Sequence, residues 1–399
     1  MVNMHIPFVN LGRFYSKHKD QILELTDNIG RSGVYILGDV VEEFERDFAD
    51  FCGVDHAISV GNGTDALALG LTALNVGKDD EVIIPANSFI STAGAVIEAG
   101  ATPICVDVEN DQNICLNSIK NAISKKTKAI IVVHLNGNPA RIDEIINEFK
   151  DTNIKIIEDA AQSIGAKVKD KKAGNFGNCG CFSLHPLKNF HMFGDAGMIV
   201  TNSSETANKV KILRNHGLIN RDTCEVFARN SRLDSLQASY GKYLLPYLDE
   251  WTDRVIDIAE YYNEQFSGYF YTPTTRPFTK SVFHNYVIQT SRRNELSNFL
   301  KQSGIETKVH YPIPICHQPA WKKHSLPPAI IPVAEKQKDE ILSLPIYAEL
   351  TDAEIEYVAK NVVTFLFKLF RSCCGIDGCC KRRSRAVLCM GGAILRVWP

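Results

Sequence analysis

The chain has 399 residues, of which 45% are hydrophobic and 23% charged, so it can bury one large hydrophobic core and a smaller one. Its 44 basic and 46 acidic residues leave a net charge of −2, which gives no electrostatic reason to expect nucleic acid or an anionic membrane as a partner. The N-terminus lacks the apolar stretch of a signal peptide, and no segment approaches the roughly 20 apolar residues that span a bilayer. We therefore expect a cytoplasmic protein.

The first 250 residues show the pattern of an α/β domain. After two helical stretches around the Gly-rich turn at 32–38, short apolar runs alternate with helix-length segments such as 64–74 and 91–98. This alternation is typical of a parallel sheet covered by helices, and it predicts a three-layer α/β/α domain. The apolar runs are HAISV, DEVIIP, TPICVDV, KAIIVVHL and IKIIEDA, followed by the closely spaced CGCFSL and GMIVTN.

A second, smaller α+β domain is predicted over 251–368. Its strand is VFHNYVIQT, and its helices are RRNELSNFLKQSG and TDAEIEYVAKNVVTFLF. The last segment, 369–399, differs in kind, because five cysteines lie between 373 and 389 beside the basic run 381–385. Two Cys-Cys pairs could supply four thiolates to a metal, but adjacent cysteines are poor geometry for a tetrahedral site. We favour an unstructured or aberrant tail, and we predict no metal site.

Three motifs carry chemistry. The loop around Gly63 and Thr64 follows a strand and opens a helix, where free N–H groups and a hydroxyl suit a phosphate. An ordinary turn with a capping threonine is the alternative.

Asp159 ends a buried strand, where a carboxylate could hold a pyridine nitrogen in its protonated form. The alternative is that Asp159 caps a helix. Lys188 lies between two strands, five residues after Ser183, and could form a Schiff base if its pKa is lowered; most lysines are merely solvated. In this order the motifs meet the needs of a pyridoxal-phosphate site.

These motifs resemble those of the DegT/DnrJ/EryC1/StrS sugar aminotransferase family. The similarity runs over about residues 5–365 and includes VGNGTDAL, PANSFISTAGAVIEAGATPICVDV, IEDAAQSIGA, FSLHPLKNFHMFGDAGMIVTN, NSRLDSLQAS and HYPIPICHQPA. The resemblance implies the fold of aspartate aminotransferase, which is fold type I of the enzymes that use pyridoxal phosphate. It also implies an enzyme that moves an amino group from an amino acid, by family habit L-glutamate, to a keto-sugar.

The resemblance also assigns roles to residues. Lys188 matches the lysine that binds the cofactor and moves the proton, Asp159 the partner of the pyridine nitrogen, and Gln162 the residue beside the phenolic oxygen. Asn230 matches an asparagine that reaches the phosphate from a neighbouring subunit, which implies a homodimer with shared sites. The phosphate set is Gly63, Thr64, Asp65 and Ser183; the ring-stacking residue is Phe89, for which core packing is the alternative; and the residues predicted to touch the sugar are His185, His310, Tyr311 and His317.

Two other functions remain open at this point. A dehydratase of the same family would remove a sugar hydroxyl with the same cofactor, but such enzymes typically carry histidine at the position of Lys188. A non-catalytic protein that binds a sugar or acts as a regulator on the same fold would not need Lys188, Asp159, Thr64 and Ser183 together. The expected substrate is a nucleotide-linked 3- or 4-keto-6-deoxy sugar of amino-sugar biosynthesis.

Overall fold

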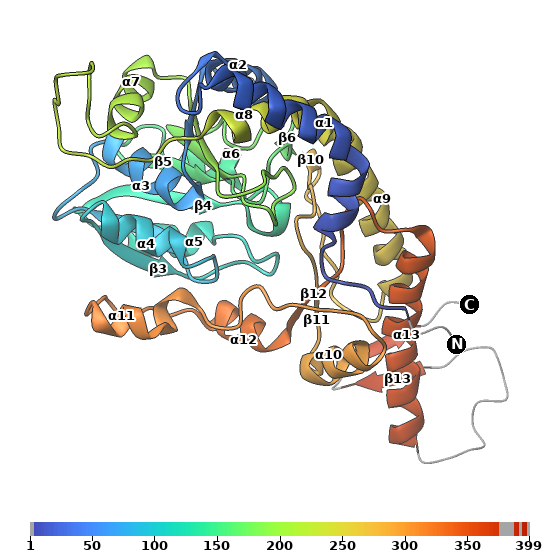
Figure 1. The fold of residues 1–399 in the computed structure, drawn as a ribbon. Helices are drawn as coiled ribbons and strands as arrows, with labels where there is room; N and C mark the ends of the chain where they lie inside the picture. Colours follow the sequence, from blue (N-terminus) through green and yellow to red (C-terminus); the bar gives the residue numbers. More distant parts are fainter. Residues whose placement is uncertain (1–3, 375–386, 391–392, 397–399) are drawn as a thin grey trace.

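A seven-stranded sheet forms the centre of the protein (Figure 1). The computed structural model describes residues 4–374, 387–390 and 393–396. Within the sheet, β8, β5, β4, β2 and β3 run parallel in that order, and β9 lies antiparallel between β1 and β8. The strands are β1 (His56–Val60), β2 (Glu81–Pro85), β3 (Thr102–Val106), β4 (Thr127–Val133), β5 (Lys155–Asp159), β8 (Cys179–Ser183) and β9 (Gly197–Thr201).

Helices cover both faces of this sheet, as the alternating sequence pattern predicts. One face packs against α3 (Gly63–Ala73), α4 (Ser91–Glu98), α7 (Ser204–Leu213), α11 (Pro319–Lys323) and α12 (Pro332–Glu340). The other face packs against α5 (Leu116–Ala122) and α6 (Ile142–Phe149) beside β2 to β5, and against α1 (Leu11–Ser32), α2 (Asp39–Cys52) and α8 (Ser235–Leu244) beside β8 and β9. Because side chains alternate along a strand, neighbouring residues of the central strands enter different hydrophobic clusters.

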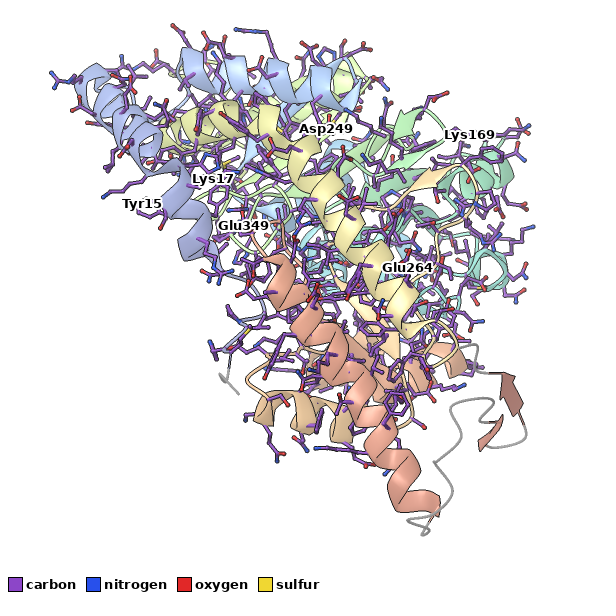
Figure 2. The ribbon with its side chains drawn as sticks, turned by 90° about the vertical axis from the view of Figure 1, so that its right-hand side faces the viewer. Tyr15, Lys17, Lys169, Asp249, Glu264 and Glu349 are labelled. Carbon is purple, nitrogen blue, oxygen red and sulfur yellow. The ribbon has the colours of Figure 1, made fainter. Side chains whose placement is uncertain are left out.

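A separate hydrophobic cluster gathers the C-terminal elements. It joins α9 (Leu248–Phe266), α10 (Arg293–Gln302) and α13 (Asp352–Cys374) with the two-stranded sheet of β11 (Tyr286–Gln289) and β12 (Ile341–Leu344). Figure 2 shows α9 and α13 running side by side, with Asp249 at the start of α9 and Glu264 near its end. The start of α9 packs on the large sheet and its later turns pack in the C-terminal cluster, so the predicted boundary at 250/251 lies inside one continuous helix.

The remaining elements are short. They are β6 (Lys167–Val168), β7 (Lys171–Lys172) and β10 (Thr279–Lys280), which form a small sheet, and the 3₁₀ turns η1 (Leu135–Gly137), η2 (Leu245–Tyr247) and η3 (Ile315–His317). Most of the predicted tail, including the basic run, lies outside the described residues; the described parts of it are the end of α13 and the hairpin of β13 (Val387–Met390) and β14 (Ala393–Arg396). Across the described residues, every helix is too short or too polar to cross a membrane.

Candidate active site

Asp159 lies at the carboxyl end of β5, where the parallel strands of the sheet end. The residue is 6% exposed, and its carboxylate accepts hydrogen bonds from the Thr92 hydroxyl on α4 (3.1 Å) and from the Ala161 N–H (3.2 Å). Burial raises the pKa of Asp159, while the Ala161 N–H and the nearby Lys188 charge act in the opposite direction. A protonated ring nitrogen beside Asp159 would stabilise the ionised form of the carboxylate, because opposite charges attract each other strongly in a buried site.

The neighbouring Glu158 points to the other face of the sheet and has a different role. Its carboxylate is fully buried and is surrounded by donors: the His134 ring at 2.9 Å and the N–H groups of Gly174 (2.8 Å), Phe176 (2.6 Å) and Gly177 (2.7 Å). These four donors occupy both carboxylate oxygens, so Glu158 ties the loop at 174–177 to the sheet and has no free lone pair directed toward the face on which Asp159 lies.

Lys188 supplies the amine of the site. It lies in the loop between β8 and β9, and its own N–H donates to the His185 carbonyl at 2.9 Å. Burial lowers the pKa of Lys188 to about 8, with the negative charge of Asp159 opposing that shift. A lysine with this pKa is partly neutral near physiological pH, and the neutral amine is the form that attacks a carbonyl carbon.

The loop before α3 brings a helix start, a glycine and hydroxyl groups together at the end of β8. Asn62 caps the helix by accepting from the Asp65 N–H at 2.8 Å. A Cβ on Gly63 would lie 2.6 Å from Cβ of Ser183, so only glycine lets this helix start pack against the end of β8. The Thr64 hydroxyl bonds the Ser91 hydroxyl at 2.8 Å. Since the first N–H groups of a helix have no partner within it, they and these hydroxyls suit an anion.

The side chains of Gln162 and Tyr311 contact each other through a hydrogen bond. The Gln162 carbonyl oxygen accepts from the Asn136 N–H at 2.7 Å, which directs its amide NH2 toward the Tyr311 hydroxyl at 3.2 Å. Burial raises the pKa of Tyr311 to about 12, so the phenol keeps its proton. The Phe89 ring lies 5.7 Å from the Tyr311 ring and is 51% exposed, which core packing would not produce.

The predicted histidines differ in their surroundings. His310 bonds the Ser343 hydroxyl at 2.9 Å, and burial lowers its pKa to about 4. His185 is exposed and accepts from the Leu187 N–H at 3.2 Å. His317 lies in η3 and pairs with Glu335 of α12 at 3.1 Å, so its ring is held against that helix.

Asp65 and Asn230, the last two predicted residues, lie on the same side of the molecule. The Asp65 carboxylate accepts from the Ser231 hydroxyl at 2.6 Å and from the Arg229 guanidinium at 3.1 Å. Asn230 itself is exposed. Asn230 therefore lies between two residues that are held by Asp65.

The sequence reasoning missed His284, Asn136 and Thr92. Burial lowers the pKa of His284 far below its ordinary value, and the Lys188 and His310 charges lower it further, which places this neutral ring close to both. Asn136 adopts a left-handed conformation with φ 58° and bonds Gln112, Gln162 and Asn285. The Asn-Gly sequence at 136–137 is a turn signal that could have marked this bend, whereas nothing in the sequence pattern singles out His284 or Thr92.

Residues 16–363 match the DegT/DnrJ/EryC1/StrS aminotransferase family. The chain belongs to this family. Among curated relatives, it is 38% identical to the pleiotropic regulatory protein of Geobacillus stearothermophilus, over 91% of this chain and 99% of the relative. It is also 38% identical to a UDP-N-acetyl-3-dehydro-alpha-D-glucosamine 3-aminotransferase of Acidithiobacillus ferrooxidans, over 90% and 98%.

Solved structures of the family show the same fold. DesV of S. venezuelae, crystallised in complex with a ketimine intermediate, superposes with a TM-score of 0.88 at 35% identity, over 90% of this chain and 98% of that one. NtdA of Bacillus subtilis, with bound cofactor PMP, gives 0.82 at 30% identity, over 91% and 85%. The predicted family, the fold-type-I architecture and the aminotransferase class are confirmed.

Proposed function

We propose that this chain transfers an amino group from L-glutamate to a nucleotide-linked keto-sugar, with pyridoxal phosphate bound at Lys188. One observation carries the proposal: a half-buried lysine, whose pKa is lowered to about 8, lies close enough to a buried aspartate at the carboxyl edge of the sheet to be affected by its charge. The family match and the cofactor-bound relative support the cofactor. The relative named as a UDP-sugar aminotransferase supports a nucleotide-linked sugar, in amino-sugar biosynthesis.

The residues present fit both the phosphate group and the pyridine ring of pyridoxal phosphate. The start of α3, with Gly63, Thr64 and the adjacent Ser183, would hold the phosphate. Asp159 would pair with the ring nitrogen, and the amide NH2 of Gln162 would donate to the phenolic oxygen. The half-exposed Phe89 ring would stack on the pyridine.

Different residues of the chain would carry out different steps of the reaction. When bound, the cofactor supplies an aldehyde that condenses with amines and a ring that accepts electrons. Asp159 would keep the ring nitrogen protonated through its negative charge. Lys188 Nζ would hold the cofactor and, once displaced by the amine of glutamate, would accept the proton from the glutamate Cα and return it as the acid of the next step. The same residues act in reverse order on the keto-sugar.

The sugar would lie beside the histidines and the tyrosine of the later chain. His310 and Tyr311 both stay uncharged near neutral pH, so they would bind hydroxyls by hydrogen bonds and would leave the charge balance of Lys188 and Asp159 unchanged. We place the exposed His185 at the mouth of the site. His317, which pairs with Glu335, would reach the sugar only by giving up that contact.

We further propose a homodimer with shared sites, in which Asn230 of one subunit reaches the phosphate bound by the other. The exposed position of Asn230 and the strongly exposed Phe227 just before it support a surface that a second copy covers. The cytoplasmic location stays a prediction.

Two measurements test the function. The purified protein, incubated with pyridoxal phosphate, should develop the absorbance of a lysine-bound cofactor and lose it in Lys188→Ala. A panel of nucleotide-linked 3- and 4-keto-sugars should then be assayed with glutamate, following 2-oxoglutarate. A protein that stays colourless at saturating cofactor would contradict the proposal.

A regulator on this fold is the second candidate, because one relative is named a pleiotropic regulatory protein. It predicts a protein that binds a sugar nucleotide but forms no 2-oxoglutarate with any keto-sugar of the panel. The family's dehydratases are disfavoured by the lysine at position 188, and they would release a dehydrated sugar that still lacks the amino group.

A further inference from the structure

The Asp65 carboxylate is occupied by contacts within its own chain. Its Oδ2 accepts from the Ser231 hydroxyl at 2.6 Å and from the Asn62 amide at 3.2 Å, and its Oδ1 accepts from the Arg229 guanidinium at 3.1 Å. Arg229 also pairs with Glu98 at the end of α4. A carboxylate repels a phosphate at close range, whereas here its charge is used to bind an arginine and a serine.

The segment 229–231 is fixed at both of its ends, to the loop after β1 and to the residues that follow α7. Ser231 is 2% exposed; its hydroxyl also accepts from the Gly61 N–H at 2.9 Å, and its own N–H donates to the Arg214 carbonyl at 2.8 Å. The Arg229 carbonyl accepts from the His216 N–H at 2.8 Å. The side chains on either side of Asn230 thus both contact Asp65, and Asn230 remains exposed between them.

We propose that Asp65 is a positioning residue for the cofactor site of the other subunit. By holding Arg229 and Ser231 it fixes the direction in which Asn230 projects, and Asn230 then donates to the phosphate held by the second copy of the chain. Asp65 is also the third residue of α3, the helix whose start would bind the phosphate of its own subunit. Its N–H donates to the side chain of Asn62, the residue that caps this helix. Asp65 therefore joins the phosphate cradle of one subunit to the residue which that subunit contributes to the other.

This inference rests on the proposed shared site, so its test separates the two. Differently tagged subunits are co-expressed and the heterodimer is purified. One subunit is wild type, and its partner carries Lys188→Ala together with a second change, so that only the wild-type subunit attaches cofactor covalently. The concentration of pyridoxal phosphate that half-saturates the lysine-bound absorbance then reports one site alone.

In this heterodimer, Asn230→Ala on the Lys188→Ala subunit should raise the half-saturating concentration about tenfold, the effect of one hydrogen bond to a charged group. Asp65→Asn on that same subunit should raise it by several-fold, and Ser231→Ala should do likewise without changing the charge. Moving Ser231→Ala to the wild-type subunit should leave the value nearly unchanged. Asp253→Asn, which removes a surface pair with Lys280, is the matched control and should have no effect in either subunit.

Three other results of this experiment would each overturn a different part of the proposal. If Asn230→Ala matters across the interface but Asp65→Asn does not, Asp65 does not act through Asn230 and the shared site stands. If Asp65→Asn weakens binding only in the subunit that carries the lysine, Asp65 serves its own phosphate loop. If Asn230→Ala has no effect in either subunit, the shared site itself is wrong.

Discussion

The two sides of β5 carry neighbouring buried carboxylates with different surroundings. On one side, Glu158 has four donors, three from the loop 174–177 and one from His134 just after β4, and it is fully buried. On the other side, Asp159 has two donors and lies near the Lys188 amine. The difference shows that the number of unused acceptor positions distinguishes a structural carboxylate from one that can bind a ligand, since burial alone does not.

The largest effect is expected on the Asp159 side, at Lys188. Lys188→Ala removes both the group that holds the cofactor and the base that moves the proton, so kcat should fall by at least about 10³-fold. Steady-state kinetics with glutamate check this. Lys169→Ala, in the turn between β6 and β7 (Figure 2), is the control and should keep wild-type rates.

Asp159→Asn should have the next largest effect. The amide keeps the shape but cannot stabilise a protonated ring nitrogen, so kcat should fall on the order of 10²–10³-fold while the thermal stability changes little. The described residues between β5 and β6 form no helix, so a variant with near wild-type kcat would show that Asp159 only holds the turn after β5 through its bond with the Ala161 N–H.

Glu158→Gln is the matched change on the other side of β5. It should lower the stability of the protein and leave kcat nearly unchanged, the opposite of Asp159→Asn. The amide NH2 would face N–H donors in a fully buried site, which should cost about 2–4 kcal/mol of unfolding free energy. Urea denaturation checks this. The folded variant should keep kcat within a few-fold of wild type, and a loss as large as that of Asp159→Asn would contradict the division between the two sides.

The pH dependence of cofactor attachment tests the Lys188 environment. Only the neutral amine reacts, so with a pKa of about 8 the attachment rate should rise about tenfold from pH 7 to pH 9 and then level off. Because the negative charge of Asp159 raises the pKa of Lys188, Asp159→Asn should move the midpoint to lower pH. A rate that keeps rising toward pH 10.5 would mean that the lysine is solvated.

The sequence predicts the parts of the site that are local in the chain. The helix at 91–98 has the observed bounds of α4, and the phosphate loop and Asp159 lie at strand ends as expected. The partners of these groups were not predictable, because folding brings them from far along the chain. His284 comes near Lys188 from the loop before β11, and Arg229 and Ser231 meet Asp65 from over 160 positions away. A hydrophobic pattern carries no information about such pairs.

Mass spectrometry after borohydride reduction tests the central claim most directly. The holoenzyme is reduced, digested and mapped, with Lys188→Ala treated in parallel. The account predicts the added mass of the cofactor on the peptide that contains Lys188 and on no peptide of the variant. The same mass on a different lysine, or on none, would contradict it.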